Sequence, residues 1–248
     1  MTETGHVART LRALELLAAR PLTQAELAAG LGVHPRTARR LLDSLVAEGY
    51  AAASGEGGRP RYAATLKVMG LVGPVLERSD VVQVAAPFVA DLRSRTGESA
   101  HLSVPREDGV LRVVRESDGN LVTIKARVGE LVPFHSTATG KALLAHLPAA
   151  FERMRDGGLE RRTERTVVDP VDLLLELATI RERGYALDDR EHAPDLRCAA
   201  AAVFDGAGGP VAALGISAPA SRLPARALPE LGELVAERAR ALSGELGG

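Results

Sequence analysis

The segment from Thr23 to Val46 restricts the fold most, because it holds two helix starts with only a short glycine-containing turn between them. Thr23 can cap a helix, and Glu26 follows at the spacing of a capping box. That helix should end at Gly30–Leu31–Gly32. Pro35 then stands where the first residue of a helix tolerates proline. The sequence therefore predicts a helix, a short turn and a second helix.

Apolar residues on both sides of the turn predict a small three-helix unit. One stripe at helical spacing lies before Pro21 and consists of Val7, Leu11, Leu14 and Leu17. Leu27 and Leu31 are predicted to face inward from the short helix. In the helix after Pro35, the residues predicted to face inward are Leu41, Leu42, Leu45 and Val46.

The helix after Pro35 begins with a cluster of basic and polar residues, which are Arg36, Thr37, Arg39 and Arg40. In helix-turn-helix proteins this end enters the major groove, where arginine can bond guanine and threonine can contact phosphate or a thymine methyl. Residues 51–65 then predict two short strands around a glycine-rich tip, a wing whose Arg59 and Arg61 contact phosphate or the minor groove. A packing unit with solvated arginines is the alternative.

Charge and apolar content limit the class of protein. The net charge of −1 argues against a chain that is basic throughout, although residues 1–65 hold eight arginines against six acidic residues. No apolar run approaches the roughly 20 residues of a membrane helix, and the N-terminus lacks a signal-peptide pattern. The single cysteine, Cys198, excludes an internal disulfide and suits a reducing compartment. We expect a soluble cytoplasmic protein with no membrane partner.

Patterning divides the chain into three parts. Residues 1–65 form the helix-turn-helix unit, 66–80 a linker helix, and 81–248 a second domain that begins with a helix near 81–95. The linker carries Leu66, Met69, Leu71 and Val72, too few residues for a core of its own. They are expected to be buried either against a partner subunit or against the second domain.

The second domain alternates strands with helices. Strands are predicted at 99–105, 110–116, 120–126, 185–189, 199–204 and 211–217, with a further extended piece at 129–134. Helices are predicted at about 138–147, 149–156, 170–183 and 225–243. This order favours an α+β fold with a mostly antiparallel sheet covered by helices.

The stretch FHSTATGKALLAH, residues 134–146, raises the question of a nucleotide loop. The G-x-x-x-x-G-K-[S/T] pattern is absent, because His135 replaces the leading glycine and Ala142 replaces the hydroxyl residue. The stretch instead predicts a helix start with free N–H groups that can bind a carboxylate. A plain alternative is that Thr137 only caps the helix and Gly140 only permits close packing.

Together, the winged helix, PFHSTATGKALLA, GYALDDREHAPDLRCAAAAVFD and ALGISAPASRL resemble the IclR family of bacterial transcriptional regulators over most of the chain. The resemblance implies a winged helix-turn-helix joined by a linker helix to a GAF-like α/β effector-binding domain. It also implies a ligand-responsive repressor or activator that binds double-stranded operator DNA and a small organic or aromatic acid. Family members are homodimers or dimers of dimers, so a homotetramer is possible, and no cofactor is implied.

The resemblance also implies an effector site, which can be carried over residue by residue. The implied site residues are Leu121, Ile124 and Val132 as apolar walls, Ala138 and Thr139 as N–H donors, and Asp188, Cys198 and Ser217 on the opposite side. Some family members carry one serine at the position of Ser217 and another serine two residues earlier, where this chain has Gly215. That departure removes a hydroxyl and leads us to expect room for a bulkier effector.

Enzymatic and metal-binding readings find little support. Cys198 and His192, with Asp188 or Asp189, do not have a recognised catalytic spacing, and Ser136 lacks the G-x-S-x-G elbow. A metal bound by His101, Asp188, His192 and Cys198 would lack any closely spaced ligand pair. We therefore expect no catalytic residue, no metal and no cofactor. The alternative function is a metabolite-binding or enzymatic module whose N-terminal helices serve oligomerisation only.

Overall fold

The computed structural model describes residues 5–55, 60–117 and 127–247, and the chain divides into two compact units, Met1–Arg78 and Ser79–Gly248. The division lies within the segment that the sequence assigns to a linker. The predicted strand at 120–126, with Leu121 and Ile124, and the wing residue Arg59 lie outside the described residues. Each unit has its own hydrophobic core.

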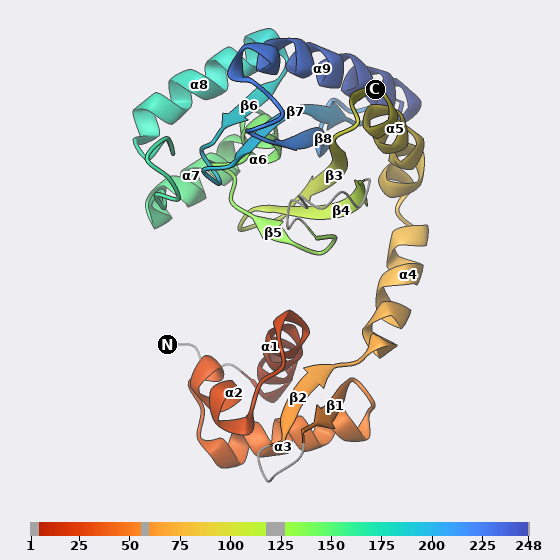
Figure 1. The fold of residues 1–248 in the computed structure, drawn as a ribbon, viewed down its shortest axis with the longest axis vertical. Coiled ribbons are helices and arrows are strands. Elements are labelled where there is room, and N and C mark those ends of the chain that lie inside the picture. Colours follow the sequence, from red (N-terminus) through yellow and green to blue (C-terminus); the bar gives the residue numbers. More distant parts are fainter. Residues whose placement is uncertain (1–4, 56–59, 118–126, 248) are drawn as a thin grey trace. The chain divides into compact units, whose positions relative to one another are not determined.

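The N-terminal unit is a three-helix core with a two-stranded wing (Figure 1). Its elements are α1 (His6–Ala19), α2 (Gln24–Leu31), α3 (Pro35–Ala47), β1 (Ala51–Ser54) and β2 (Arg61–Ala64), followed by the 3₁₀ turn η1 (Leu66–Val68) and α4 (Met69–Glu77). The predicted capping box is present: Thr23 N donates to Glu26 Oε2 at 2.7 Å and Glu26 N donates to Thr23 Oγ1 at 3.2 Å. The Thr23 backbone N–H holds the pKa of Glu26 at about 2.

Three predictions about inward-facing residues in this unit were wrong. Leu17 is buried together with Ala13, but Val7 and Leu11 are 72% and 58% exposed, because they lie off the side of α1 that Ala13 and Leu17 bury. Val46 is 40% exposed, since it lies one position past Leu45 at the edge of the buried arc of α3. A helical stripe shows which face is apolar but not where the neighbouring elements stop covering it.

The segment predicted as a linker, residues 66–80, contains η1 followed by α4, an apolar helix with Pro74 inside it. Leu66, Met69 and Leu71 are 86%, 61% and 53% exposed in this chain. Burial of these residues against a partner subunit remains a prediction.

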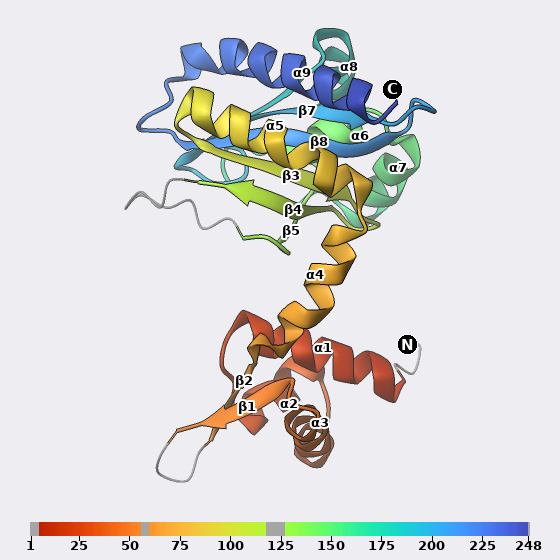
Figure 2. The same ribbon diagram turned by 90° about the vertical axis from the view of Figure 1, so that its right-hand side faces the viewer.

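Within its described residues, the C-terminal unit is a six-stranded antiparallel sheet with helices on both faces (Figures 1 and 2). Its strands, in the spatial order β5-β4-β3-β8-β7-β6, are β5 (Leu131–Val132), β4 (Val110–Glu116), β3 (Ser99–Pro105), β8 (Pro210–Pro219), β7 (Leu196–Phe204) and β6 (Ala186–Asp189). Its helices are α5 (Asp80–Thr96), α6 (Ala138–Leu144), α7 (Pro148–Gly157), α8 (Pro170–Arg183), the 3₁₀ turn η2 (Ala225–Ala227) and α9 (Leu228–Glu245).

The two faces of the sheet pack against different helices. On one face, Ala100, Leu102 and Leu214 pack in one cluster with residues of α5 and α9. On the other, Val132, Ala138 and Cys198 belong to a second cluster formed with α6, α7 and α8. Because side chains alternate along a strand, β6, β7 and β8 each contribute apolar residues to both clusters. The second face carries the polar residues described below.

Candidate functional site

A row of polar residues crosses the sheet on the face that α6 covers. The register pairs Ser99 with Ser217, Ser217 with Cys198, and Cys198 with Asp188, so four neighbouring strands each place one polar residue on a line. The Cys198 Sγ and the Ser217 Oγ are 3.2 Å apart. Antiparallel pairing therefore brings together Asp188, Cys198 and Ser217, which the sequence could only propose as neighbours.

Gly215 does not leave an empty space beside this row. A Cβ at Gly215 would lie 3.0 Å from His101 Nε2 and 3.0 Å from the Thr139 Cγ2 methyl. The buried imidazole of His101 and the Thr139 side chain therefore occupy the volume of the missing side chain. The expectation of room for a bulkier effector at this position was wrong.

The start of α6 is built by capping and close backbone contact. Thr137 Oγ1 accepts a hydrogen bond from Gly140 N at 3.1 Å and donates one to Pro133 O at 2.7 Å. A Cβ at Gly140 would lie 2.3 Å from Phe134 O, so only glycine fits there. Thr137 therefore caps α6 and Gly140 permits a close backbone contact, while carboxylate binding by the N–H groups of this helix start stays a prediction. Ala138 and Thr139, the predicted N–H donors, are both buried at the first turn.

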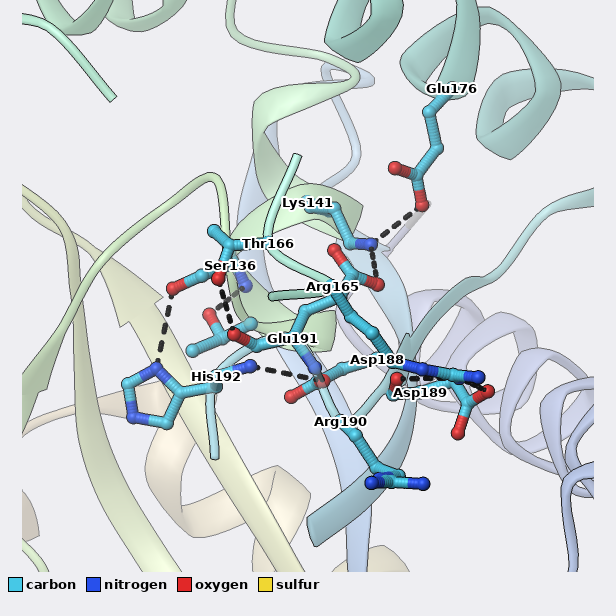
Figure 3. A network of polar contacts seen from close by, with 12 residues as sticks. Ser136, Lys141, Arg165, Thr166, Glu176, Asp188, Asp189, Arg190, Glu191 and His192 are labelled. Atoms are coloured by element: carbon cyan, nitrogen blue, oxygen red, sulfur yellow. Dashed lines mark hydrogen bonds and ion pairs between the residues drawn. The ribbon is translucent and has the colours of Figure 1, made fainter. Parts of the chain in front are cut away.

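Lys141 is the centre of a buried ionic network (Figure 3). Its Nζ, in a side chain with no exposed area, lies 2.6 Å from Glu176 Oε1 on α8 and 2.6 Å from Glu191 Oε1 after β6. Burial raises the pKa of Glu191 to about 7, whereas the carboxylates raise the pKa of Lys141 against the opposing effect of burial. Sequence reasoning missed this network, although a lysine inside the apolar run KALLA requires a buried counter-ion.

Asp188 shapes the loop that follows β6. Its Oδ1 accepts hydrogen bonds from Glu191 N at 2.7 Å and from His192 N at 3.3 Å (Figure 3). Arg190, which lies between Asp188 and Glu191, has a φ of 68°. Such a left-handed conformation is uncommon for a residue other than glycine, and the two hydrogen bonds hold it in place. Ser136 Oγ lies 3.3 Å from His192 Nδ1, so the loop also contacts the start of α6.

Asp188 should give the unfolding free energy a defined pH dependence. Burial raises its pKa from 3.8 to about 6, so the folded chain retains a proton that the unfolded chain has lost between these values. The contribution of Asp188 to the unfolding free energy is therefore complete below pH 3.8 and is lost as the pH rises through about 6. Relative to Asp188→Asn, the wild type should lose about 2–3 kcal/mol of stability between about pH 4 and pH 7. Urea unfolding across that range measures it, and parallel pH profiles would contradict it.

The Cys198 environment does not favour a nucleophile. Burial and the neighbouring Asp188 carboxylate raise the pKa of the Cys198 thiol well above its ordinary range. A cysteine nucleophile acts as the thiolate, which such an environment suppresses. No group of three or more His, Cys, Asp or Glu side chains arranged to hold a metal occurs within the described residues.

Two buried residues on the α6 face were not among the predicted effector contacts, although His101 was considered as a metal ligand. His101 on β3 is 3% exposed and Arg112 on β4 is 7% exposed. Burial, and then the charges of Arg112 and Arg115, keep the pKa of His101 well below its ordinary range. A separate groove of about 470 Å³, lined by residues such as Pro105, Leu147 and Arg153, contains none of the predicted effector residues.

The predicted DNA-reading residues occupy the first turns of α3. Arg36, Arg39 and Arg40 are exposed, and Thr37 is half-buried. Arg39 Nε lies 2.9 Å from Asp43 Oδ1, an exposed pair one turn along the helix. Arg61 of the wing donates to Pro21 O at 2.7 Å and lies 3.2 Å from Glu26 Oε2, so its guanidinium already contacts the N-terminal side of α2. No described helix is long and apolar enough to cross a membrane.

Comparisons with known proteins agree for both units. The model of the IclR helix-turn-helix domain matches residues 6–55, and that of the bacterial transcriptional regulator IclR C-terminal region matches residues 73–244. The regulator BhcR of Paracoccus denitrificans is 36% identical, with 95% of this chain and 85% of BhcR covered. The repressor IclR of Escherichia coli is 31% identical, with 99% and 92% covered. An IclR homologue from Microbacterium hydrocarbonoxydans, solved with 4-hydroxybenzoate, has a TM-score of 0.80 at 25% identity and covers 98% of this chain and 99% of its own.

Proposed function

The chain belongs to the IclR family of bacterial transcriptional regulators, and from this premise we propose how its two units divide the work of a ligand-responsive, DNA-binding regulator. The N-terminal unit reads double-stranded operator DNA. The polar face of the C-terminal sheet binds a small organic or aromatic acid. Binding of that acid favours one arrangement of the DNA-reading units over another, which is how a ligand shifts an equilibrium between states.

DNA reading is assigned to the leading end of α3. The residues proposed to enter the major groove are Arg36, Thr37, Arg39 and Arg40. The exposure of three arginines at one helix end, with Ala38, Leu41 and Leu42 buried on the opposite face, is the observation that carries this assignment. Arg59 and Arg61 are proposed to contact the DNA backbone from the wing. Arg61 would then exchange its contact with Glu26 for a phosphate.

Replacing Arg39 by alanine should weaken binding to a specific operator by about 10- to 100-fold, and binding to random DNA by much less. The exposed pair with Asp43 is too weak to hold Arg39 away from a base. Gel shifts on both DNAs at several salt concentrations measure the effect. Arg155→Ala, in the C-terminal unit, is the control. An equal loss on both DNAs, with a salt slope shallower by about one, would make Arg39 a phosphate contact instead.

The effector site is assigned to the face that α6 covers. The proposed contacts are Leu121, Ile124, Val132, Ala138, Thr139, Asp188, Cys198 and Ser217. The line from Asp188 through Cys198 to Ser217 beside the first turn of α6 supports this assignment. The homologue solved with 4-hydroxybenzoate supports an aromatic acid as one candidate class.

We further propose that the regulator works as a homodimer or a dimer of dimers in the cytoplasm, without catalytic activity. A regulator that reads two half-sites needs two reading units. The exposed Leu66, Met69 and Leu71 are proposed to be buried against a second copy. Repression is the proposed sense of regulation, since the Escherichia coli relative is named a repressor.

The decisive test of the proposed function is a gel shift of the full-length chain with DNA flanking its own gene, with and without a panel of small carboxylic acids. A salt-sensitive shift that a carboxylate alters supports the proposal. No shift under any of these conditions would favour the alternative, a metabolite-binding or enzymatic module whose N-terminal helices mediate only oligomerisation.

A further inference from the structure

We propose that Arg112 is the residue of the effector site that binds the carboxylate of the ligand, through the Nε edge of its guanidinium. This assignment rests on the proposed function of the α6-covered sheet face as the effector site. It adds a residue that neither the sequence motifs nor the family resemblance points to.

The location of Arg112 is unusual for an arginine. It lies within β4, opposite Ser103 of β3, and only 7% of it is exposed. Arginine is almost never buried to this extent unless its charge is paired and its donors are hydrogen-bonded. A side chain of this kind in the interior therefore needs a partner on every edge.

One edge of the guanidinium is satisfied. Its NH1 lies 2.5 Å from Glu130 Oε2. Glu130 is held there by the backbone, because Arg112 N donates to Glu130 O at 3.0 Å and Gly129 N donates to Arg112 O at 2.8 Å. The same carboxylate oxygen accepts a hydrogen bond from Arg127 N at 3.1 Å. This pairing fixes the orientation of the guanidinium.

The other edge is not satisfied. Arg112 Nε is buried and has no hydrogen-bond partner within the described part of the chain. A buried charged donor without a partner destabilises a folded protein, and arginine binds a carboxylate strongly with two parallel N–H groups. A ligand carboxylate is the group that would satisfy this edge while Glu130 keeps the NH1 edge.

The surroundings of Arg112 favour an anion. Its charge reaches the predicted effector row, since it adds to the larger effect of burial in lowering the pKa values of His101 and His192 and opposes the larger effect of burial that raises the pKa of Cys198. Burial lowers the pKa of His192 to about 4, so this imidazole is neutral at physiological pH. Arg115, three residues further along β4, donates to Ser99 Oγ at 3.2 Å and adds a second positive charge. Arg112 and Arg115 therefore place two positive charges beside the β3 end of the row, whereas the acidic Asp188 lies at its β6 end.

The test compares acids with their uncharged amides on the full-length chain. The probes are benzoate, 4-hydroxybenzoate and acetate, each with the corresponding amide, and binding is measured by thermal shift and titration calorimetry. Arg112→Met should weaken carboxylate binding by about 10- to 100-fold and amide binding by less than about 3-fold. Arg112→Lys should recover part of the carboxylate affinity, because it restores the charge without the two-pronged geometry.

Two controls separate this role from others. Arg106→Met, which removes an exposed arginine from the β3–β4 turn, should leave every affinity unchanged. The midpoint of thermal unfolding of ligand-free Arg112→Met should lie within about 3 °C of that of the wild type, because Glu130 is partly exposed and becomes hydrated. If Arg112 had a purely structural role, its replacement would lower this midpoint further.

The outcomes distinguish this proposal from the proposed function. Ser217→Ala, which removes a neutral hydroxyl from the row, should weaken acid and amide alike. If Ser217→Ala does so but Arg112→Met affects acid and amide equally, the effector site stands and the role of Arg112 is refuted. If only Arg112→Met acts, the role of Arg112 stands and the effector row is misplaced. If no carboxylate in the panel stabilises the wild type, the assignment of Arg112 is overturned.

Discussion

Replacing Lys141 by methionine should lower the free energy of unfolding of the C-terminal unit by about 3–5 kcal/mol, the usual cost of leaving buried charges without their partner. The ammonium group is fully buried and has two carboxylate oxygens at 2.6 Å. The Glu191 side chain is only 12% exposed, so water cannot replace the lost cation there. The midpoint of thermal unfolding should fall by roughly 10 °C, followed by circular dichroism or calorimetry.

The pH dependence and two further variants identify the cause of this loss. At pH 5 the cost should be smaller than at pH 8, because Glu191, whose pKa is raised by burial, takes up a proton at the lower pH once the lysine is absent. Adding Glu176→Gln and Glu191→Gln to Lys141→Met should recover much of the stability. Arg155→Met, which removes an exposed cation paired with Glu152 and Asp156, should cost less than about 1 kcal/mol. If Lys141→Met costs no more than this control, the network does not stabilise the fold.

Gly140 lies in α6, the helix that also holds Lys141. Replacing Gly140 by alanine should lower the free energy of unfolding of the C-terminal unit by at least about 3 kcal/mol. The added Cβ would lie 2.3 Å from Phe134 O and 2.6 Å from Phe134 Cα, both backbone atoms that no side-chain rotation can move. The gain in helix propensity from glycine to alanine, about 1 kcal/mol, is too small to offset this overlap. Soluble yield and the urea midpoint measure the effect.

Gly157→Ala is the matched control. Gly157 belongs to α7 of the same unit, and a Cβ there would meet no heavy atom within 4 Å. That variant should be unchanged or more stable by up to about 1 kcal/mol. If Gly140→Ala behaves in the same way, the contact between α6 and the Pro133–Phe134 segment is not as tight as the structure indicates.

The sequence predicted best those features that depend on neighbours in the chain. The capping box of Thr23 and Glu26, the end of α2 before Gly32 and the proline at the start of α3 all depend on residues a few positions apart. The described strands of the C-terminal sheet were predicted because alternation and turn residues are equally local signals.

Features that depend on distant residues were not predicted. The two partners of Lys141 lie 35 and 50 residues further along the chain, so no local pattern connects them. Arg112 occurs in the strand VLRVVRE, where alternation alone does not say which face is covered. The register between β3 and β4 also shifts between Leu102 and Ser103, which changes the pairing on either side of that point.

Alternation along β3 has a consequence for how such a sensor can diverge. Ser99, His101 and Ser103 face α6, whereas Ala100 and Leu102 pack in the core with α5 and α9. Under the proposed function, exchange of every second residue of this strand would change which metabolite is recognised, while the intervening residues belong to the core with α5 and α9. A mutational library restricted to the α6-facing positions would explore new specificities, as in the engineering of biosensors, and would leave the core with α5 and α9 unchanged.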